Sequence, residues 1–89
     1  MSKAWKIYFA KQALKDAKKL QNSNLKSKAQ EILEVISNNP FVDFPPYEKL
    51  VGDLSGAYSR RINIQHRMVY QVDKSNKRVK ILRMWSHYE

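Results

Sequence analysis

The first half of this chain carries two stripes of apolar residues at helical spacing. In residues 10–21, small and apolar side chains recur at the spacing of one helix face: Ala10, Ala13, Leu14, Ala17 and Leu20. Residues 25–36 repeat this spacing with Leu25, Ala29, Ile32, Leu33 and Ile36. Polar residues 22–24 separate the stripes, and Pro40 follows the second, where a helix would end. The pattern predicts two antiparallel helices, each with one face that must be buried against another element.

The element that buries these faces is predicted to be a β-sheet. Residues 5–9 are aromatic and β-branched, which is typical of a strand. Three further strand-like stretches, 58–64, 67–72 and 78–85, lie near the end of the chain. The polar turn at residues 73–77 joins the last two, which favours an antiparallel meander. We therefore expect an α+β fold: two helices packed on one face of an antiparallel sheet of about four strands.

Length and composition exclude several kinds of protein. The 89 residues suffice for one domain, expected to span residues 1–89. The absence of cysteine excludes disulfides, zinc–thiolate sites and a thiol nucleophile, and the two histidines are too few for a multi-histidine metal site. No apolar run approaches the roughly 18 residues of a membrane span, and no signal peptide opens the chain. We expect a cytoplasmic protein with no membrane partner, no metal and no cofactor.

Charge gives the first indication of function. Lysine and arginine total 17 against eight acidic residues, a formal net charge of +9. A small domain this basic typically binds a polyanion, although charge that serves solubility alone remains an alternative. All five arginines follow residue 58. Because arginine grips phosphate with a planar fork that lysine lacks, the C-terminal part is expected to carry the anion-binding surface.

Helices on one face of the sheet would leave its other face uncovered. If Met68 and Tyr70 point to the helices, and Leu82 and Met84 do the same, residues of opposite parity point away from them. The residues then expected on the open face are Arg61, Arg67, Arg83, Trp85 and His87. Such a face is predicted to form an anion-binding groove.

Residues 41–57 show no sustained periodicity and contain Pro45, Pro46, Gly52 and Gly56, which indicates a long loop. Loops of this length in small domains are uncommon and are usually functional or disordered. Aromatic residues within this segment argue against disorder. The loop also carries Glu48, and we expect it to contribute to function.

One carboxylate, one imidazole and several guanidinium groups suffice for metal-independent RNA cleavage. A base removes the proton of a ribose 2′-OH, a cation stabilises the charged pentacoordinate phosphorus, and an acid protonates the leaving 5′-oxygen. Glu48, Arg67 and His87 could fill these three roles in that order. Each also has an ordinary interpretation, as a surface charge or as part of a chain end. The residue types therefore allow this reaction without selecting it.

Four ordered sequence blocks resemble a known family. They are residues 47–50 (YEKL), 54–62 (LSGAYSRRI), 66–70 (HRMVY) and 86–88 (SHY). In this pattern the chain resembles the YoeB/Txe-type toxins of the RelE superfamily, which are ribosome-dependent mRNA endoribonucleases of type II toxin–antitoxin modules. The resemblance implies a RelE-like, microbial ribonuclease-like fold.

The resemblance also implies roles for individual residues. The implied catalytic residues are Glu48 as general base, Arg67 on the scissile phosphate, His87 as general acid, and Tyr88 beside it. Arg61 is expected to help hold phosphates, and Lys49 and Arg83 are expected to contact RNA as well. The implied reaction is cleavage of mRNA in the ribosomal A site by 2′-OH attack on the adjacent phosphate, without a metal, and its result is inhibition of translation.

Three partners are implied: a YefM-type antitoxin, the 70S ribosome with its mRNA, and a second copy of the chain in a homodimer. Two alternatives of other kinds stay open. One is a non-catalytic module that binds RNA or the ribosome, in which Glu48 and His87 are incidental. The other is a ParE-like toxin that shares the fold but targets gyrase; the terminal His-Tyr pair favours the ribonuclease over it.

Overall fold

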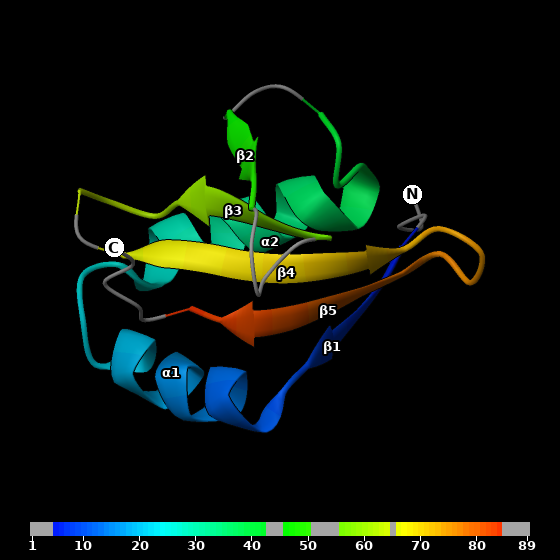
Figure 1. Cartoon of the computed structure of the whole chain (residues 1–89). Helices are drawn as coiled ribbons and strands as arrows, with labels where there is room; N and C mark the ends of the chain where they lie inside the picture. Colours follow the sequence, from blue (N-terminus) through cyan, green and yellow to red (C-terminus); the bar gives the residue numbers. More distant parts are fainter. Residues whose placement is uncertain (1–4, 43–45, 51–55, 65, 85–89) are drawn as a thin grey trace.

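One mixed sheet and two helices make up the described chain. The computed structural model describes residues 5–42, 46–50, 56–64 and 66–84. Its helices are α1 (Lys11–Gln21) and α2 (Lys26–Asn38); its strands are β1 (Lys6–Phe9), β2 (Tyr47–Lys49), β3 (Ala57–Arg61), β4 (Arg67–Asp73) and β5 (Arg78–Arg83). The strands form a single five-stranded sheet in the order β1-β5-β4-β3-β2 (Figure 1).

The predicted α+β architecture is confirmed, and so is the antiparallel meander of the later strands. Strands β2 to β5 pair antiparallel in chain order, whereas β1 pairs with β5 in parallel. A parallel pair needs a long connection between its strands, and here the whole chain between β1 and β5 provides it. Sequence periodicity carries no information about such distant pairings. The prediction of an entirely antiparallel sheet is therefore wrong for β1, which is parallel to β5.

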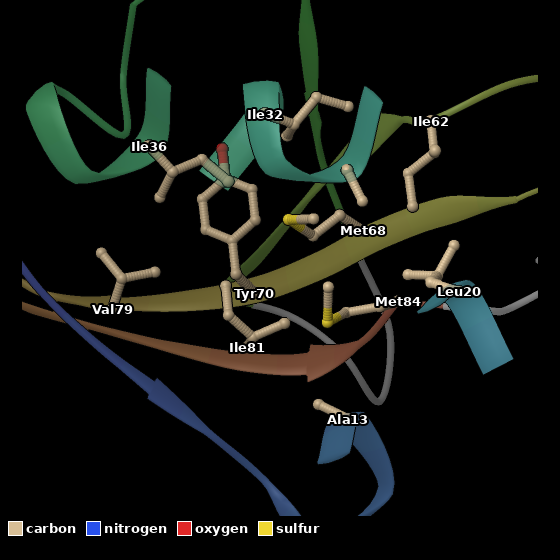
Figure 2. Close-up of a cluster of buried hydrophobic side chains, with 11 residues drawn as sticks. Ala13, Leu20, Ile32, Ile36, Ile62, Met68, Tyr70, Val79, Ile81 and Met84 are labelled. Carbon is tan, nitrogen blue, oxygen red and sulfur yellow. The ribbon is translucent and has the colours of Figure 1, made fainter. Parts of the chain in front are cut away.

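The hydrophobic core lies between the two helices and one face of the sheet. Figure 2 shows Met68 and Tyr70 pointing from β4 towards Ile32 and Ile36 of α2. These four side chains are at most 1% exposed. Five of the ten residues of the predicted helix stripes are buried and four are half-buried, whereas Leu14 is 53% exposed. Among the described residues, neither helix is long and apolar enough to cross a membrane.

Strand β2 lies inside the segment that was expected to be a loop. Its three residues pair with β3 in the register Tyr47↔Arg60, Glu48↔Ser59 and Lys49↔Tyr58. Three residues are too few to show an alternating pattern, and proline-rich sequence precedes them. Proline is tolerated at the start of an edge strand, which is where β2 lies. This short strand gives Glu48 a fixed place beside β3.

At the end of β5 the orientation expected for Leu82 is wrong, whereas Met84 lies in the core as expected. Val79 and Ile81 are the buried residues of β5, so strand alternation turns Leu82 away from the helices, and Arg83 then pairs with Val69 and not with core-facing Tyr70. Arg83 donates from Nε to Asp16 Oδ2 of α1 at 3.0 Å. A register shift opposite Val69 and Tyr70 accompanies this arrangement. The apolar run at the end of β5 contains both parities, so sequence alone did not reveal which side faces the helices.

Alternation also fails at the end of the strand-like stretch 58–64. Continued alternation would put Ile64 on the same side as Tyr58 and Ile62, but Ile64 is 86% exposed while Ile62 is 3% exposed. The strand ends at Arg61, and residues 62–64 form a bend. Alternation of side chains therefore stops before Ile64.

Candidate active site

Strands β2, β3 and β4 bring three of the predicted site residues together on the open face. Glu48 pairs with Ser59 across β2 and β3, and Arg61 pairs with Arg67 across β3 and β4. All four side chains line one pocket of about 260 Å³, together with Pro46. The predicted grouping of Glu48, Arg61 and Arg67 on one surface is therefore found in the structure.

An ion pair occupies this pocket. Arg67 Nη1 donates a hydrogen bond to Glu48 Oε1 and lies 3.5 Å from Ser59 Oγ. The Arg67 side chain is 23% exposed and that of Glu48 is 65% exposed. The guanidinium is thus sheltered against the sheet, whereas the carboxylate reaches solvent. A polar molecule that approaches the open face meets the carboxylate first and has the cation behind it.

The turn between β3 and β4 fixes the two arginines of the pocket. Ile62 N donates to His66 O at 2.8 Å, and the backbone N–H of His66 donates to Asn63 Oδ1 at 2.7 Å. These bonds close the turn and place Arg61 opposite Arg67 in the strand register. Two cations and one carboxylate then line the pocket, which leaves it net positive. Such a lining suits an anion with several oxygen atoms, such as a phosphodiester.

Arg60, a buried arginine that the sequence did not single out, packs against Tyr47 of β2. Arg60 is 0% exposed and donates from Nη2 to Pro40 O at 3.0 Å and to Val42 O at 2.8 Å. Its Nε donates to Tyr70 Oη at 3.0 Å, and its guanidinium lies 5.0 Å from the ring centroid of Tyr47. Arg60 thus joins the segment after α2 to β4 and to the residue before Glu48. Strand alternation was the one signal that could have found it: Arg60 and Arg61 are neighbours in β3, so if Arg61 faces solvent, Arg60 must point to the other side of the sheet.

Tyr70 shares this buried cluster. Its hydroxyl donates to Pro40 O at 3.0 Å while it accepts the bond from Arg60. Burial raises the pKa of the Tyr70 phenol above its ordinary value, and the nearby charge of Arg60 opposes this rise. The neutral hydroxyl can therefore keep both of its hydrogen bonds across the neutral pH range.

The remaining predicted site residues lie elsewhere or outside the described ranges. Lys49 is exposed, and strand alternation places it on the opposite side of β2 from Glu48. Arg83 is bound to Asp16, with 42% of its side chain exposed. His87 and Tyr88, like Trp85, lie outside the described residues. Within the described ranges, no group of three or more histidine or acidic side chains could hold a metal ion.

Solved structures similar to this one share its arrangement of elements. YoeB from Staphylococcus aureus, solved as a YoeB–YefM complex, is 39% identical, has a TM-score of 0.80, and is covered over 98% of its length and 94% of this chain. A structure titled as the YoeB dimer from that organism has a TM-score of 0.81 at 38% identity, over 96% of this chain and 99% of the other. RelE from the Pyrococcus horikoshii RelE–RelB complex has a TM-score of 0.76 at 22% identity, over 94% of this chain and 96% of the other, which shows the RelE-like fold alone.

Sequence comparisons agree with the structural ones. Toxin YoeB from Synechocystis sp. is 39% identical over 57 residues, which span 64% of this chain and 59% of that relative, less than two thirds of its length. The family model described as YoeB-like toxin of bacterial type II toxin-antitoxin system matches residues 9–88. The resemblance carried by the four sequence blocks is thereby confirmed. Because the matched region is nearly the whole chain, the chain belongs to the YoeB-like toxins of bacterial type II toxin–antitoxin systems.

Proposed function

We propose that this toxin is a ribosome-dependent endoribonuclease that cleaves mRNA in the A site and so inhibits translation. The observation that carries the proposal is the pocket in which exposed Glu48 is paired with sheltered Arg67 beside Arg61. A general base and two phosphate-binding cations on one open face are what 2′-OH attack on a phosphodiester requires. The family match supports the toxin part of the proposal independently.

The ion pair suggests how substrate engages the site. A phosphate that enters the pocket competes with Glu48 for the Arg67 guanidinium, since both are oxyanions. Once phosphate takes that position, the carboxylate is free to accept the 2′-OH proton. The 2′-oxygen then attacks phosphorus, and Arg67 stabilises the added negative charge with Arg61 nearby. General base help contributes about 10²–10⁴-fold in rate, and one such charge stabiliser about 10²–10³-fold.

The leaving 5′-oxygen needs a proton when its bond to phosphorus breaks. We assign this proton to His87, with Tyr88 as a supporting residue, on the basis of the terminal His-Tyr block. The reaction then yields a 2′,3′-cyclic phosphate and a free 5′-hydroxyl, with no metal in the proposed scheme. Lys49 and Arg83 are proposed as RNA contacts outside the pocket, Arg83 through the exposed part of its side chain.

The partners proposed for this chain follow its relatives. The Staphylococcus aureus YoeB was solved in complex with YefM and as a dimer. We extend both associations to this chain, as a YefM-like antitoxin and a homodimer. The net charge of +9 supports the third partner, the ribosome with its mRNA, because an excess of cations favours binding to RNA.

Mapping of mRNA 5′ ends on programmed ribosomes tests this function. Primer extension is run with wild type, Glu48→Gln, His87→Gln and the control Lys15→Gln, which removes an exposed charge from α1. We expect new ends within the A-site codon for wild type and Lys15→Gln, and at least a 100-fold lower rate for the other two. Uncut mRNA with tight ribosome binding by wild type would contradict the proposal and favour a binding module.

A further inference from the structure

A second basic surface lies on the open face, at the sheet edge far from β2. Tyr8 of β1 pairs with Lys80 of β5, and Lys6 pairs with Arg78. Ile7 and Phe9 pack against the core, so alternation turns Tyr8 and Lys6 to the open face. We call Lys6, Tyr8, Arg78 and Lys80 the edge surface. It is built from β1 and β5, which lie side by side at one edge of the sheet (Figure 1).

The edge surface presents an aromatic ring among cations. Tyr8 is 45% exposed, one of the few large hydrophobic side chains in the described part of the chain with that much exposure. The Arg78 guanidinium lies 5.6 Å from the centroid of the Tyr8 ring, within cation–π range. Tyr8, Arg78 and Lys80 line a hollow of about 580 Å³ together with Gln71 of β4. The hollow therefore offers a ring face, two cations, an amide and the carboxylate of Asp73.

One carboxylate, that of Asp73, borders the edge surface and binds one of its cations. Asp73 Oδ2 accepts hydrogen bonds from Arg78 Nη2 at 3.1 Å and from Asn76 Nδ2 at 2.9 Å. The bonds from Asn76 and from Arg78 hold the pKa of Asp73 below its ordinary value, so its carboxylate stays charged beside Arg78. Three cations against this single acid leave the edge surface net positive.

We infer that the edge surface is a second binding site for single-stranded RNA, with a base stacked on Tyr8 and backbone phosphates on Arg78 and Lys80. Stacking platforms flanked by cations are the usual means of holding single strands without sequence preference. An acidic protein segment would use the cations but would leave the exposed ring without a flat partner. The combination of ring and charge favours RNA.

The geometry connects this surface to the proposed active site. Arg67 and Asp73 lie at the two ends of β4 and share one face of the strand. At about 3.4 Å per residue they are about 20 Å apart, so one extended RNA strand can reach both places. The inference rests on the proposed function in one respect: the RNA on the edge surface is taken to be continuous with the strand whose phosphate binds Arg67.

Binding to an RNA that cannot be cleaved tests the edge surface separately from catalysis. The probe is a fluorescein-labelled 2′-O-methyl RNA of about 12 nucleotides, which has no 2′-OH to attack and lies within known single-strand site sizes. Fluorescence anisotropy gives Kd for the wild-type protein and for Tyr8→Leu, Tyr8→Phe and Lys80→Gln. The matched control is Lys15→Gln, which removes the same charge from the exposed side of α1.

We expect Tyr8→Leu to raise Kd about 10-fold and Tyr8→Phe to leave it nearly unchanged, because the ring is retained. Lys80→Gln should lower the slope of log Kd against log salt by about 0.7, the value for one phosphate contact on a single strand, and Lys15→Gln should lower it less. Equal Kd values for Tyr8→Leu and Tyr8→Phe, or equal slopes for the two lysine variants, would overturn the inference. The cleavage role of Glu48 does not enter this measurement, so failure of the proposed function would appear only in the 5′-end mapping.

Discussion

Among single residues, the neighbouring arginines Arg60 and Arg61 differ sharply in burial. Arg60 is fully buried and donates to two backbone carbonyls and to Tyr70, whereas Arg61 is exposed at the rim of the candidate active site. A buried guanidinium is tolerated only because its donors are satisfied. The two neighbours therefore differ in role: Arg60 ties the segment after α2 to β4 and contacts Tyr47 of β2, whereas Arg61 lines the open-face pocket.

This division predicts a difference in stability between matched substitutions. Arg60→Met should lower the free energy of unfolding by about 3 kcal/mol, because buried carbonyls and the Tyr70 hydroxyl lose their donor. Arg61→Met, the same change one residue later, should alter it by no more than about 0.5 kcal/mol. Urea unfolding followed by circular dichroism measures both. Similar losses for the two variants would show that burial does not separate their roles.

Among the secondary-structure elements, local sequence pattern predicted the helices and the later strands. It did not predict edge strand β2, nor the parallel pairing of edge strand β1 with β5. The helix stripes determine which residues are buried, so α1 and α2 could be predicted from spacing alone. Strand β2 could not, because its three residues gain their conformation from pairing with β3. The end of β5 could not either, since a register shift interrupts the strand and Arg83 donates to Asp16, which lies 67 residues earlier in the chain. Tertiary contacts decide both cases.

The link between α1 and β5 leads to a prediction at this scale. Asp16 is 0% exposed and accepts bonds from Arg83 Nε and from the backbone N–H of Met84, both at 3.0 Å. Asp16→Ala should lower the free energy of unfolding by about 3 kcal/mol, because both donors lose their acceptor. Arg83→Met should cost less, about 1 kcal/mol, since Met84 keeps its bond to Asp16. Thermal unfolding of the two variants measures the difference, and an equal cost would contradict the assigned role of Asp16.

At the scale of the whole molecule, the fold separates packing from chemistry by the two faces of one sheet. The helices cover one face, and the other carries the Glu48–Arg67 pocket near β2 and the edge surface near β1. The basic composition predicted that the chain binds a polyanion, and the sequence blocks predicted that Glu48 and Arg67 are site residues. Neither indicated the ion pair between them, because a salt bridge between residues 19 positions apart depends on strand register. The edge surface could not be predicted from the sequence either, because it forms only when β1 pairs in parallel with β5.

The proposed reaction requires Glu48 to activate a ribose 2′-OH for attack on the adjacent phosphate. Programmed ribosomes with an mRNA that carries a single 2′-deoxynucleotide at the cleaved position test this requirement. We expect wild-type protein to cut the unmodified message, to leave a 2′,3′-cyclic phosphate, and not to cut the substituted message at that position. Undiminished cleavage next to the 2′-deoxynucleotide would exclude the proposed mechanism, because that bond has no internal nucleophile for Glu48 to activate.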